Sequence, residues 1–462
     1  MGLKSHKEHG AKAWLRANTS ALQPNDPFRI GRVAMGSGAH ALAIVDANVA
    51  LMAVPQSITS LGEYVSCLGS QLARFVDSFD SVVLCYDDLS HVPVAKLAEQ
   101  RRRDRARAAA ASKKRTRPLD DGVAVGCPGE TESVLAFGEA GGCVVGDSYT
   151  LDDIVRAPDC HSFTADRTKR YRFADEVAQR LAKRFPSVVF DGIDVRGADR
   201  PVDADRVPDF YCGAVHMQSE DAFACPHAAL VAALRQGRSE PIGEADLKLW
   251  NVEQVVRDLL PGRSLVSLHA TIDTDSIPVQ LLGLASKGAA AATPNAQHLS
   301  YVSFRTPQKD GSAVFELLDV LQLQSDLSAL CGSDDHPRVA SLFAATAALG
   351  GCDFVSPPSC FRTSELLTAA CRLVRVGGDC TAVPREHLLG ACLPLTYEAF
   401  LRKCCHEAAQ LTSSAGGRNS AKRALDLCNP DPALMTRAAW CTRYWSGGAV
   451  GGGLGAWGFD DE

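Results

Sequence analysis

Acidic residues placed directly after apolar segments are the residues of this sequence that could carry chemistry. Leu265–Ile272 has the length and β-branched content of a buried strand, and Asp273 and Asp275 follow it. If the extended backbone continues past this segment, residues two apart project to the same side. Two such carboxylates repel each other unless a cation lies between them, and oxygen ligands suit Mg²⁺ or Mn²⁺. Taken alone, the pair is more typical of a polar turn in which the second aspartate caps the next helix.

Two further apolar segments end in aspartate in the same way. Ala41–Val45 is followed by Asp46, and Ser81–Tyr86 is followed by Asp87. A helical pattern from about Ile58 to Phe79 separates them, which predicts a strand–helix–strand unit of a parallel sheet. Because ligands gather beyond the carboxyl ends of such strands, we expect these aspartates to lie near the first pair.

Three more acidic residues follow other predicted elements. Glu244 and Asp246 open a predicted helix that runs to about Leu260, and Asp353 follows a segment broken by glycines. Residues two apart in a regular helix point in nearly opposite directions, so both carboxylates can reach one ion only if Glu244 lies at the helix entrance. Attraction of carboxylates to the helix dipole explains the same two residues without a metal.

A strongly basic segment follows the second predicted strand. Ten Lys or Arg and only two acidic residues lie between Lys96 and Arg117. Lys96, Arg103 and Arg107 fall on one stripe of a predicted helix. Such a run is usually a solvated helix face. Here it begins nine residues after Asp87, so we interpret it as a phosphate-binding surface. The later span Gly192–Ser219 is expected to be irregular.

Composition and charge limit the class of protein. The chain has 462 residues, 46% of them hydrophobic and 22% charged, as is ordinary for globular proteins. A net charge of −6 argues against a uniformly basic nucleic-acid coat but not against a local basic patch. No apolar run approaches the roughly 18 residues that span a bilayer, and no secretory signal is recognised. The 17 cysteines include no CxxC pair, which favours reduced thiols and an intracellular protein.

Six short segments occur along the chain in the order MGLKS, IVDANVAL, CYDD, GEAD, TIDTD and LGGCDF. In sequence and in order, they resemble segments of the FEN/XPG-type structure-specific 5′ nucleases. They are also similar to those of the Xrn-type 5′→3′ exoribonucleases and the herpesviral host-shutoff nucleases. The resemblance implies an α/β, PIN/FEN-like, mostly parallel twisted sheet flanked by helices, with a helical gateway insertion and a helical C-terminal region. The nuclease core would span 1–360 and would consist of an N-terminal part at 1–117, an insertion or lid at 118–219 and an internal part at 220–360. A helical C-terminal region at 361–445 and a Gly-rich acidic tail at 446–462 would follow it.

The same resemblance implies a two-metal nuclease that cleaves phosphodiesters at or near 5′ ends or flaps. Two Mg²⁺ or Mn²⁺ ions would flank the scissile phosphate, one activating a water and the other stabilising the leaving oxygen. The first ion would be held by Asp46, Asp87, Glu244 and Asp246, and the second by Asp273, Asp275 and Asp353. Lys96 and Arg101 would assist catalysis. The residues implied to contact nucleic acid are Gly2, Lys96, Arg101, Arg102, Arg103 and Arg107.

The segment after Asp353 departs from the DNA-acting branch of the family. Its sequence, FVSPPSC, lacks the glycine pattern of the element that grips duplex DNA, and it is more similar to the exoribonuclease form. An RNA-directed nuclease, Xrn-like or host-shutoff-like, is therefore an alternative, as is a catalytically weak nucleic-acid-binding or structural protein on the same fold. The expected partner is a DNA flap or single-stranded DNA or RNA, with no membrane and no recognisable sliding-clamp peptide. Nucleus, cytoplasm and a viral origin stay open.

Two tryptophans mark the last predicted helix, Asp431–Trp445. Trp440 and Trp445 are expected to dock this helix on the core, with stacking on bases as the alternative.

Overall fold

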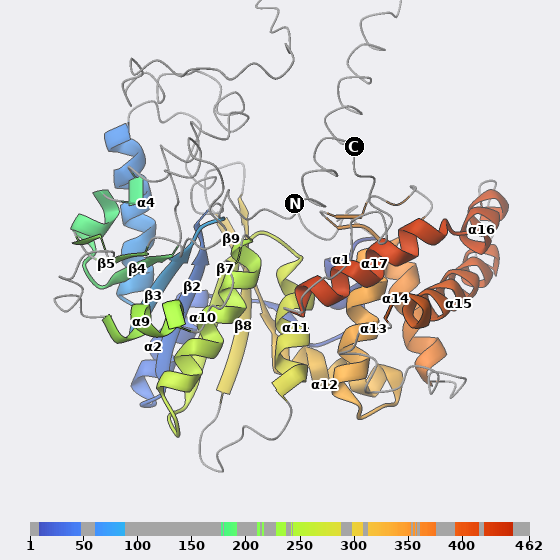
Figure 1. The fold of residues 1–462 in the computed structure, drawn as a ribbon, viewed down its shortest axis with the longest axis horizontal. Coiled ribbons are helices and arrows are strands. Elements are labelled where there is room, and N and C mark those ends of the chain that lie inside the picture. The colour runs from blue at the N-terminus through green and yellow to red at the C-terminus, as the bar shows by residue number, and fades with distance from the viewer. Residues whose placement is uncertain are drawn as a thin grey trace, which may run out of the picture.

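A computed structural model gives the fold of the chain. It describes residues 9–47, 61–87, 177–178, 180–191, 210–212, 215–216, 228–236, 242, 244–287, 298–307, 313–352, 354–355, 357, 361–375, 393–414 and 420–446. Within these residues, nine strands form one mixed sheet (Figure 1), in the spatial order β1-β9-β8-β7-β2-β3-β4-β5-β6. The strands span Leu22–Pro24 (β1), His40–Asp46 (β2), Ser81–Cys85 (β3), Val188–Asp191 (β4), Phe210–Cys212 (β5), Val215–His216 (β6), Leu265–Thr271 (β7), His298–Pro307 (β8) and Ala313–Asp319 (β9).

The central strands of the sheet run parallel, and the edge strands run antiparallel to their neighbours. β2 pairs with β3 on one side and with β7 on the other, and β4 and β8 extend this parallel part outward. β1, β9, β5 and β6 add the antiparallel edges. The chain thus leaves β2 towards β3 and later returns to β7, so the boundary between β2 and β7 is a topological switch point, where open α/β sheets bind ligands. The expected α/β fold with a mostly parallel sheet is confirmed.

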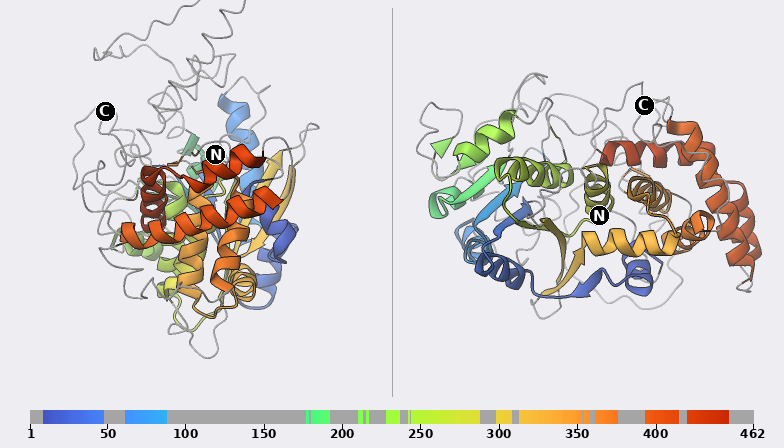
Figure 2. Two further views of the ribbon diagram at one scale, coloured as in Figure 1. Left: turned by 90° about the vertical axis from the view of Figure 1, so that its right-hand side faces the viewer. Right: turned by 90° about the horizontal axis from the view of Figure 1, so that it is seen from below.

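Helices cover both faces of the sheet, and alternation along β2 distributes its side chains between them. Ala41 and Ala43 share a core with α2 and α4. Leu42 and Ile44 point to the opposite face and pack with α9 and α10. In the view from below, Figure 2 shows the blue and the green helices on either side of the strands. These helices span Pro27–Gly36 (α2), Leu61–Val76 (α4), Ala228–Gln236 (α9) and Ala245–Leu259 (α10).

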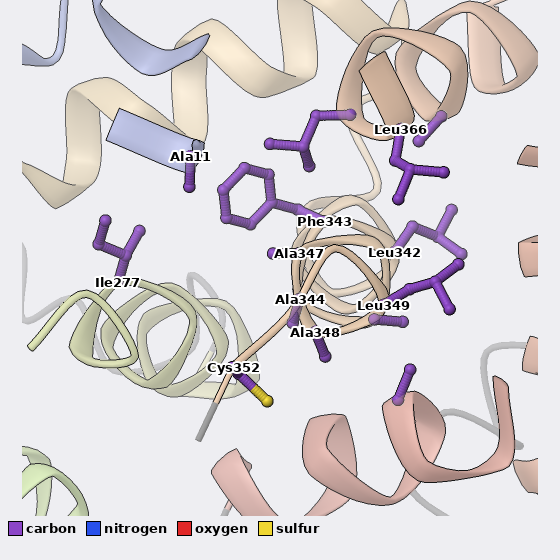
Figure 3. Packing of buried hydrophobic residues seen from close by; sticks show 14 of the residues in the cluster. Ala11, Ile277, Leu342, Phe343, Ala344, Ala347, Ala348, Leu349, Cys352 and Leu366 are labelled. Atoms are coloured by element: carbon purple, nitrogen blue, oxygen red, sulfur yellow. The ribbon is translucent and has the colours of Figure 1, made fainter. Parts of the chain in front are cut away.

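A helical region adjoins the β8 side of the sheet and shares one large hydrophobic core with α1 and α11. α13 lies at its centre (Figure 3), where every residue from Val339 to Leu349 is buried. Because this helix is rich in alanine, its neighbours approach it closely from all sides. The expected helical C-terminal region is confirmed. The helices span Ala11–Asn18 (α1), Ser276–Lys287 (α11), Val320–Cys331 (α12), His336–Leu349 (α13), Thr363–Arg375 (α14), Leu393–Ser414 (α15), Ser420–Cys428 (α16) and Pro432–Trp445 (α17).

Two local expectations differ from the structure. The span Gly192–Ser219, expected to be irregular, contributes the short edge strands β5 and β6, whose two or three residues are too few to show a period in the sequence. β7 ends at Thr271, and a turn leads from there into α11, so Asp273 and Asp275 lie in a turn and not in the extended backbone that would direct them to the same side. The division of the chain at residues 117, 219 and 360 stays a prediction.

Candidate active site

Asp46 ends β2 on the face of the sheet that α10 covers. Along β2, Leu42 and Ile44 belong to the core formed with α10, so alternation directs Asp46 to the same face. The Asp46 carboxylate is buried, and the hydroxyl of Thr271, the last residue of β7, donates to its Oδ2 across 3.4 Å. The carboxyl ends of β2 and β7 are thus in direct polar contact at the switch point.

Asp87 lies just beyond β3 and caps α10 from outside the helix. The backbone N–H of Ala245, the first residue of α10, donates to Asp87 Oδ1 at 2.9 Å. Glu244 occupies the N-cap position with an extended backbone, but its own side chain makes no capping hydrogen bond. The structure therefore places Glu244 at the helix entrance, which is the condition under which Glu244 and Asp246 can face one ion. Since the side chain of Glu244 makes no capping hydrogen bond, capping does not explain its acidic character.

Asp273 and Asp275 form the turn that the sequence alone favours. Asp273 Oδ1 accepts a hydrogen bond from the N–H of Asp275 at 3.0 Å, and the N–H of Asp273 donates to Thr271 Oγ1 at 2.9 Å. The hydroxyl of Ser276, where α11 begins, donates to the carbonyl of Asp273 at 2.7 Å. This turn fixes both aspartates at the carboxyl end of β7, so the turn and a ligand-binding role are compatible.

Four of the predicted carboxylates meet in one small pocket. Its free volume is about 10 Å³, close to the space that one water molecule occupies. Negative charges that face one small space repel each other and favour a bound cation. The pocket unites one pair from each of the two predicted metal clusters, while its lining does not include Asp46 or Asp87. Its lining residues are Glu244, Asp246, Leu247, Asp273, Asp275, Phe354, Tyr444 and Trp445.

The donor chemistry of this pocket fits Mg²⁺ or Mn²⁺, although the described residues alone do not form a closed metal cage. The four acidic residues of the lining carry carboxylates, the ligands that these hard cations prefer. Within the part of the chain that the structure describes, no group of three or more His, Cys, Asp or Glu side chains could hold a metal ion by itself. Mg²⁺ commonly keeps several waters and takes only one or two protein carboxylates together with phosphate oxygens. The described carboxylates would therefore supply only part of the coordination of such an ion.

α17 supplies the wall of the pocket opposite the sheet. Figure 1 shows the red α17 crossing towards α11, and its Tyr444 and Trp445 line the pocket with Phe354. The Trp440 and Tyr444 rings stack with centroids 5.0 Å apart, and Phe354 packs against both. Trp440 and Trp445 are buried, so they dock this helix on the core, as expected.

The remaining predicted site residues lie outside the described residues, and their roles stay predictions. Asp353 is one of them, although its neighbours on both sides are buried and Phe354 lines the pocket. The others are Gly2, Lys96, Arg101, Arg102, Arg103 and Arg107.

Sequence reasoning missed a buried lysine beside the site. Lys248 lies on α10 one turn after Glu244, and its side chain is fully buried. It is a charged residue within the stripe formed by Ala245, Leu249 and Val252, which pack on the sheet. That interruption of an apolar helix face is the signal that could have identified it.

A second polar cluster lies further along α10, beneath the middle of the sheet. Glu253 Oε2 is 2.5 Å from His269 Nε2 and accepts a hydrogen bond from Ser267 Oγ at 2.5 Å. Arg257 forms an ion pair with Glu253 Oε1 at 2.6 Å. Burial alone would raise the pKa of Glu253, but the hydrogen bond and charge of His269 and the charge of Arg257 lower it to about 2. This cluster is fully enclosed, so it holds α10 against the sheet rather than facing a ligand.

Comparison with known proteins does not assign the chain to a family. No protein-family model matches it, and no curated protein matches it. The helices that the structure describes include none with the length and apolar character needed to cross a membrane.

Proposed function

We propose that this protein is a divalent-metal-dependent nuclease that hydrolyses phosphodiesters at or near 5′ ends or flaps of nucleic acid. The observation that carries the proposal is the meeting of four carboxylates, from the start of α10 and from the turn after β7, in one small pocket. The pocket lies at the carboxyl end of β7, beside the switch point of the sheet, where an α/β fold binds its ligands. A PIN/FEN-like version of the fold, implied by the order of the motifs, is part of the same proposal.

Under this proposal, some residues would bind the metal ions and others would hold those ligands in place. Asp46, Asp87, Glu244 and Asp246 would hold one Mg²⁺ or Mn²⁺, and Asp273, Asp275 and Asp353 would hold a second. When bound, the ions supply an activated water and neutralise charge on the phosphate. Thr271 orients Asp46 through its hydroxyl, and the first turn of α10 orients Asp87 through the Ala245 N–H. The basic residues from Lys96 to Arg107 would bind the flanking phosphates.

The experiment that tests this function is the substitution Asp273→Asn, assayed for Mg²⁺-dependent cleavage of a labelled 5′-flap DNA and of a single-stranded RNA of equal length. We expect the variant to fold normally and to lose cleavage, because an amide is a poorer and neutral ligand. Asp77→Asn is the matched control, since Asp77 is exposed after α4 and lies outside the pocket. Undiminished cleavage by Asp273→Asn would refute the assignment of cleavage to this pocket, and a wild-type protein that cleaves neither substrate would refute the nuclease assignment. The ratio of the two wild-type rates separates a DNA flap nuclease from an RNA-directed one.

A catalytically weak nucleic-acid-binding protein on the same fold is the second candidate. It is favoured by the absence, among the described side chains, of three metal-binding groups close enough to hold an ion unaided. A wild-type protein that binds Mn²⁺ and nucleic acid but turns over neither substrate would support this candidate over the enzyme.

A further inference from the structure

Lys248 is a charged side chain buried completely beneath the acidic pocket. It lies on α10, and its exposed fraction is 0%. Its Nζ donates to the carbonyl oxygen of Tyr86 at 2.6 Å and lies 3.9 Å from Oδ1 of the equally buried Asp191. Lysine is almost never fully buried without a partner, because removing its charge from water is costly.

The hydrogen bond from Lys248 to Tyr86 joins the end of β3, which is followed by Asp87, to the first turn of α10, which carries Glu244 and Asp246. Tyr86 directly precedes Asp87, and Lys248 lies one turn after Glu244, whose carbonyl accepts from the Lys248 N–H at 3.2 Å. In the opposite direction, Asp87 Oδ1 accepts from the N–H of Ala245. Two hydrogen bonds, one from a side chain of each segment, therefore fasten the end of β3 to the first turn of α10.

The contact with Asp191 extends this connection to β4. The N–H of Tyr86 donates to the carbonyl oxygen of Asp191 at 3.0 Å, and Cys85 Sγ lies 3.9 Å from Asp191 Oδ2. The ammonium group has three donors, so it can serve Tyr86 and Asp191 at once. Neutralising Asp191 does not by itself require the 2.6 Å hydrogen bond from Lys248 to the carbonyl oxygen of Tyr86.

We propose that Lys248 is a positioning residue of the acidic site: it holds the Tyr86–Asp87 segment against the start of α10, so that Glu244 and Asp246 keep their places in the lining of the pocket, where a divalent ion would bind. This inference rests on the proposed function, because it assumes that the site binds a divalent cation. Lys248 acts through the backbone of Tyr86 and does not touch the ion.

The test is the affinity for Mn²⁺ alone, measured by titration calorimetry on the full chain without nucleic acid. Lys248→Met by itself leaves Asp191 buried without its cation, so the variant of interest is Lys248→Met combined with Asp191→Asn, which removes both charges. We expect this double variant to melt near the wild-type temperature but to bind Mn²⁺ about 10- to 100-fold more weakly, as is typical when an outer-shell partner is lost. The control is Lys12→Met with Glu316→Gln, which removes an ion pair of 2.7 Å, together with the ion pair of Glu316 with Arg16, outside the pocket and should leave the affinity unchanged.

Asp191→Asn alone separates the two contacts of Lys248. It keeps the hydrogen bond to Tyr86, so we expect near wild-type Mn²⁺ affinity together with a lower melting temperature, because the buried Lys248 loses its charge partner. Equal affinities of the double variant and the wild type would overturn the inference, as would an equal loss in Asp191→Asn. A wild-type protein that does not bind Mn²⁺ would instead refute the proposed function, and the inference with it.

Discussion

The first turn and the middle of α10 place carboxylates in opposite surroundings. At Glu253 the chain itself supplies the compensating groups, since His269, Arg257 and the hydroxyls of Ser267 and Ser300 all approach the carboxylate. At the start of the helix, carboxylates from two segments line a pocket whose other described lining residues are apolar or aromatic. The comparison teaches that the first cluster stabilises the fold, whereas the second, under the proposed function, binds a divalent cation.

The largest expected effect is on catalysis at the pocket. Asp246→Asn removes one lining carboxylate, so we expect Mg²⁺-dependent cleavage to fall about 10³-fold, equivalent to about 4 kcal/mol of transition-state stabilisation. The melting temperature should stay near that of the wild type, because asparagine has nearly the same size and shape as aspartate. Single-turnover cleavage and a thermal melt measure the two quantities. A large loss of stability with little loss of cleavage would show that Asp246 stabilises the fold and does not take part in cleavage.

The corresponding change in the other cluster should act on stability instead. Glu253→Gln removes a fully buried charge and leaves Arg257 and His269 without their partner, so we expect a loss of about 3–5 kcal/mol in the free energy of unfolding. Urea denaturation measures it. Glu407→Gln is the control, because Glu407 pairs with Arg372 across 3.4 Å at the surface and should cost at most about 1 kcal/mol. Glu253→Gln protein that remains folded should bind Mn²⁺ with the affinity of the wild type.

The same cluster predicts how stability depends on pH. The pKa of Glu253 is lowered from 4.5 to about 2 in the folded protein, so its contribution is complete above pH 4.5 and is lost as the pH falls towards 2. The lost contribution is about 3 kcal/mol. Urea denaturation of the wild type and of Glu253→Gln across this range should show their difference shrinking towards acid pH. A constant difference would contradict a charged Glu253 in the folded state.

The smallest expected effect concerns α17, which forms the aromatic wall of the pocket. Asp431 Oδ1 accepts from the N–H of Ala433 at 3.0 Å at the start of this helix, and Tyr444 and Trp445 lie at its other end. Asp431→Ala should cost about 1 kcal/mol, while Asp431→Asn, which can still cap, should cost less. Thermal melts compare the two. Equal destabilisation by both would show that the charge matters more than the cap.

Local sequence patterns predicted β2, β3 and β7 and the aspartates that end them or follow them, because burial on both faces leaves continuous apolar segments. Asp46 and Asp87 could be placed at the carboxyl edge for this reason. The edge strands were beyond prediction, since β1, β5 and β6 have at most three residues. Contacts such as Lys248 with Tyr86 join residues 162 positions apart and depend on packing that no local pattern records. The approach of Tyr444 to Asp273 had no sequence signal for the same reason.

Binding of a divalent cation by the acidic pocket is tested most directly by titration of the full chain with Mn²⁺ alone. We expect saturable binding by the wild type and by Glu253→Gln, and a loss of binding when Asp273→Asn and Asp275→Asn are combined. The loss should occur without a large fall in melting temperature, because an asparagine at position 273 can still accept the backbone N–H of residue 275. Equal Mn²⁺ binding by the wild type and this double variant, or no binding by the wild type, would show that the pocket is not a cation site.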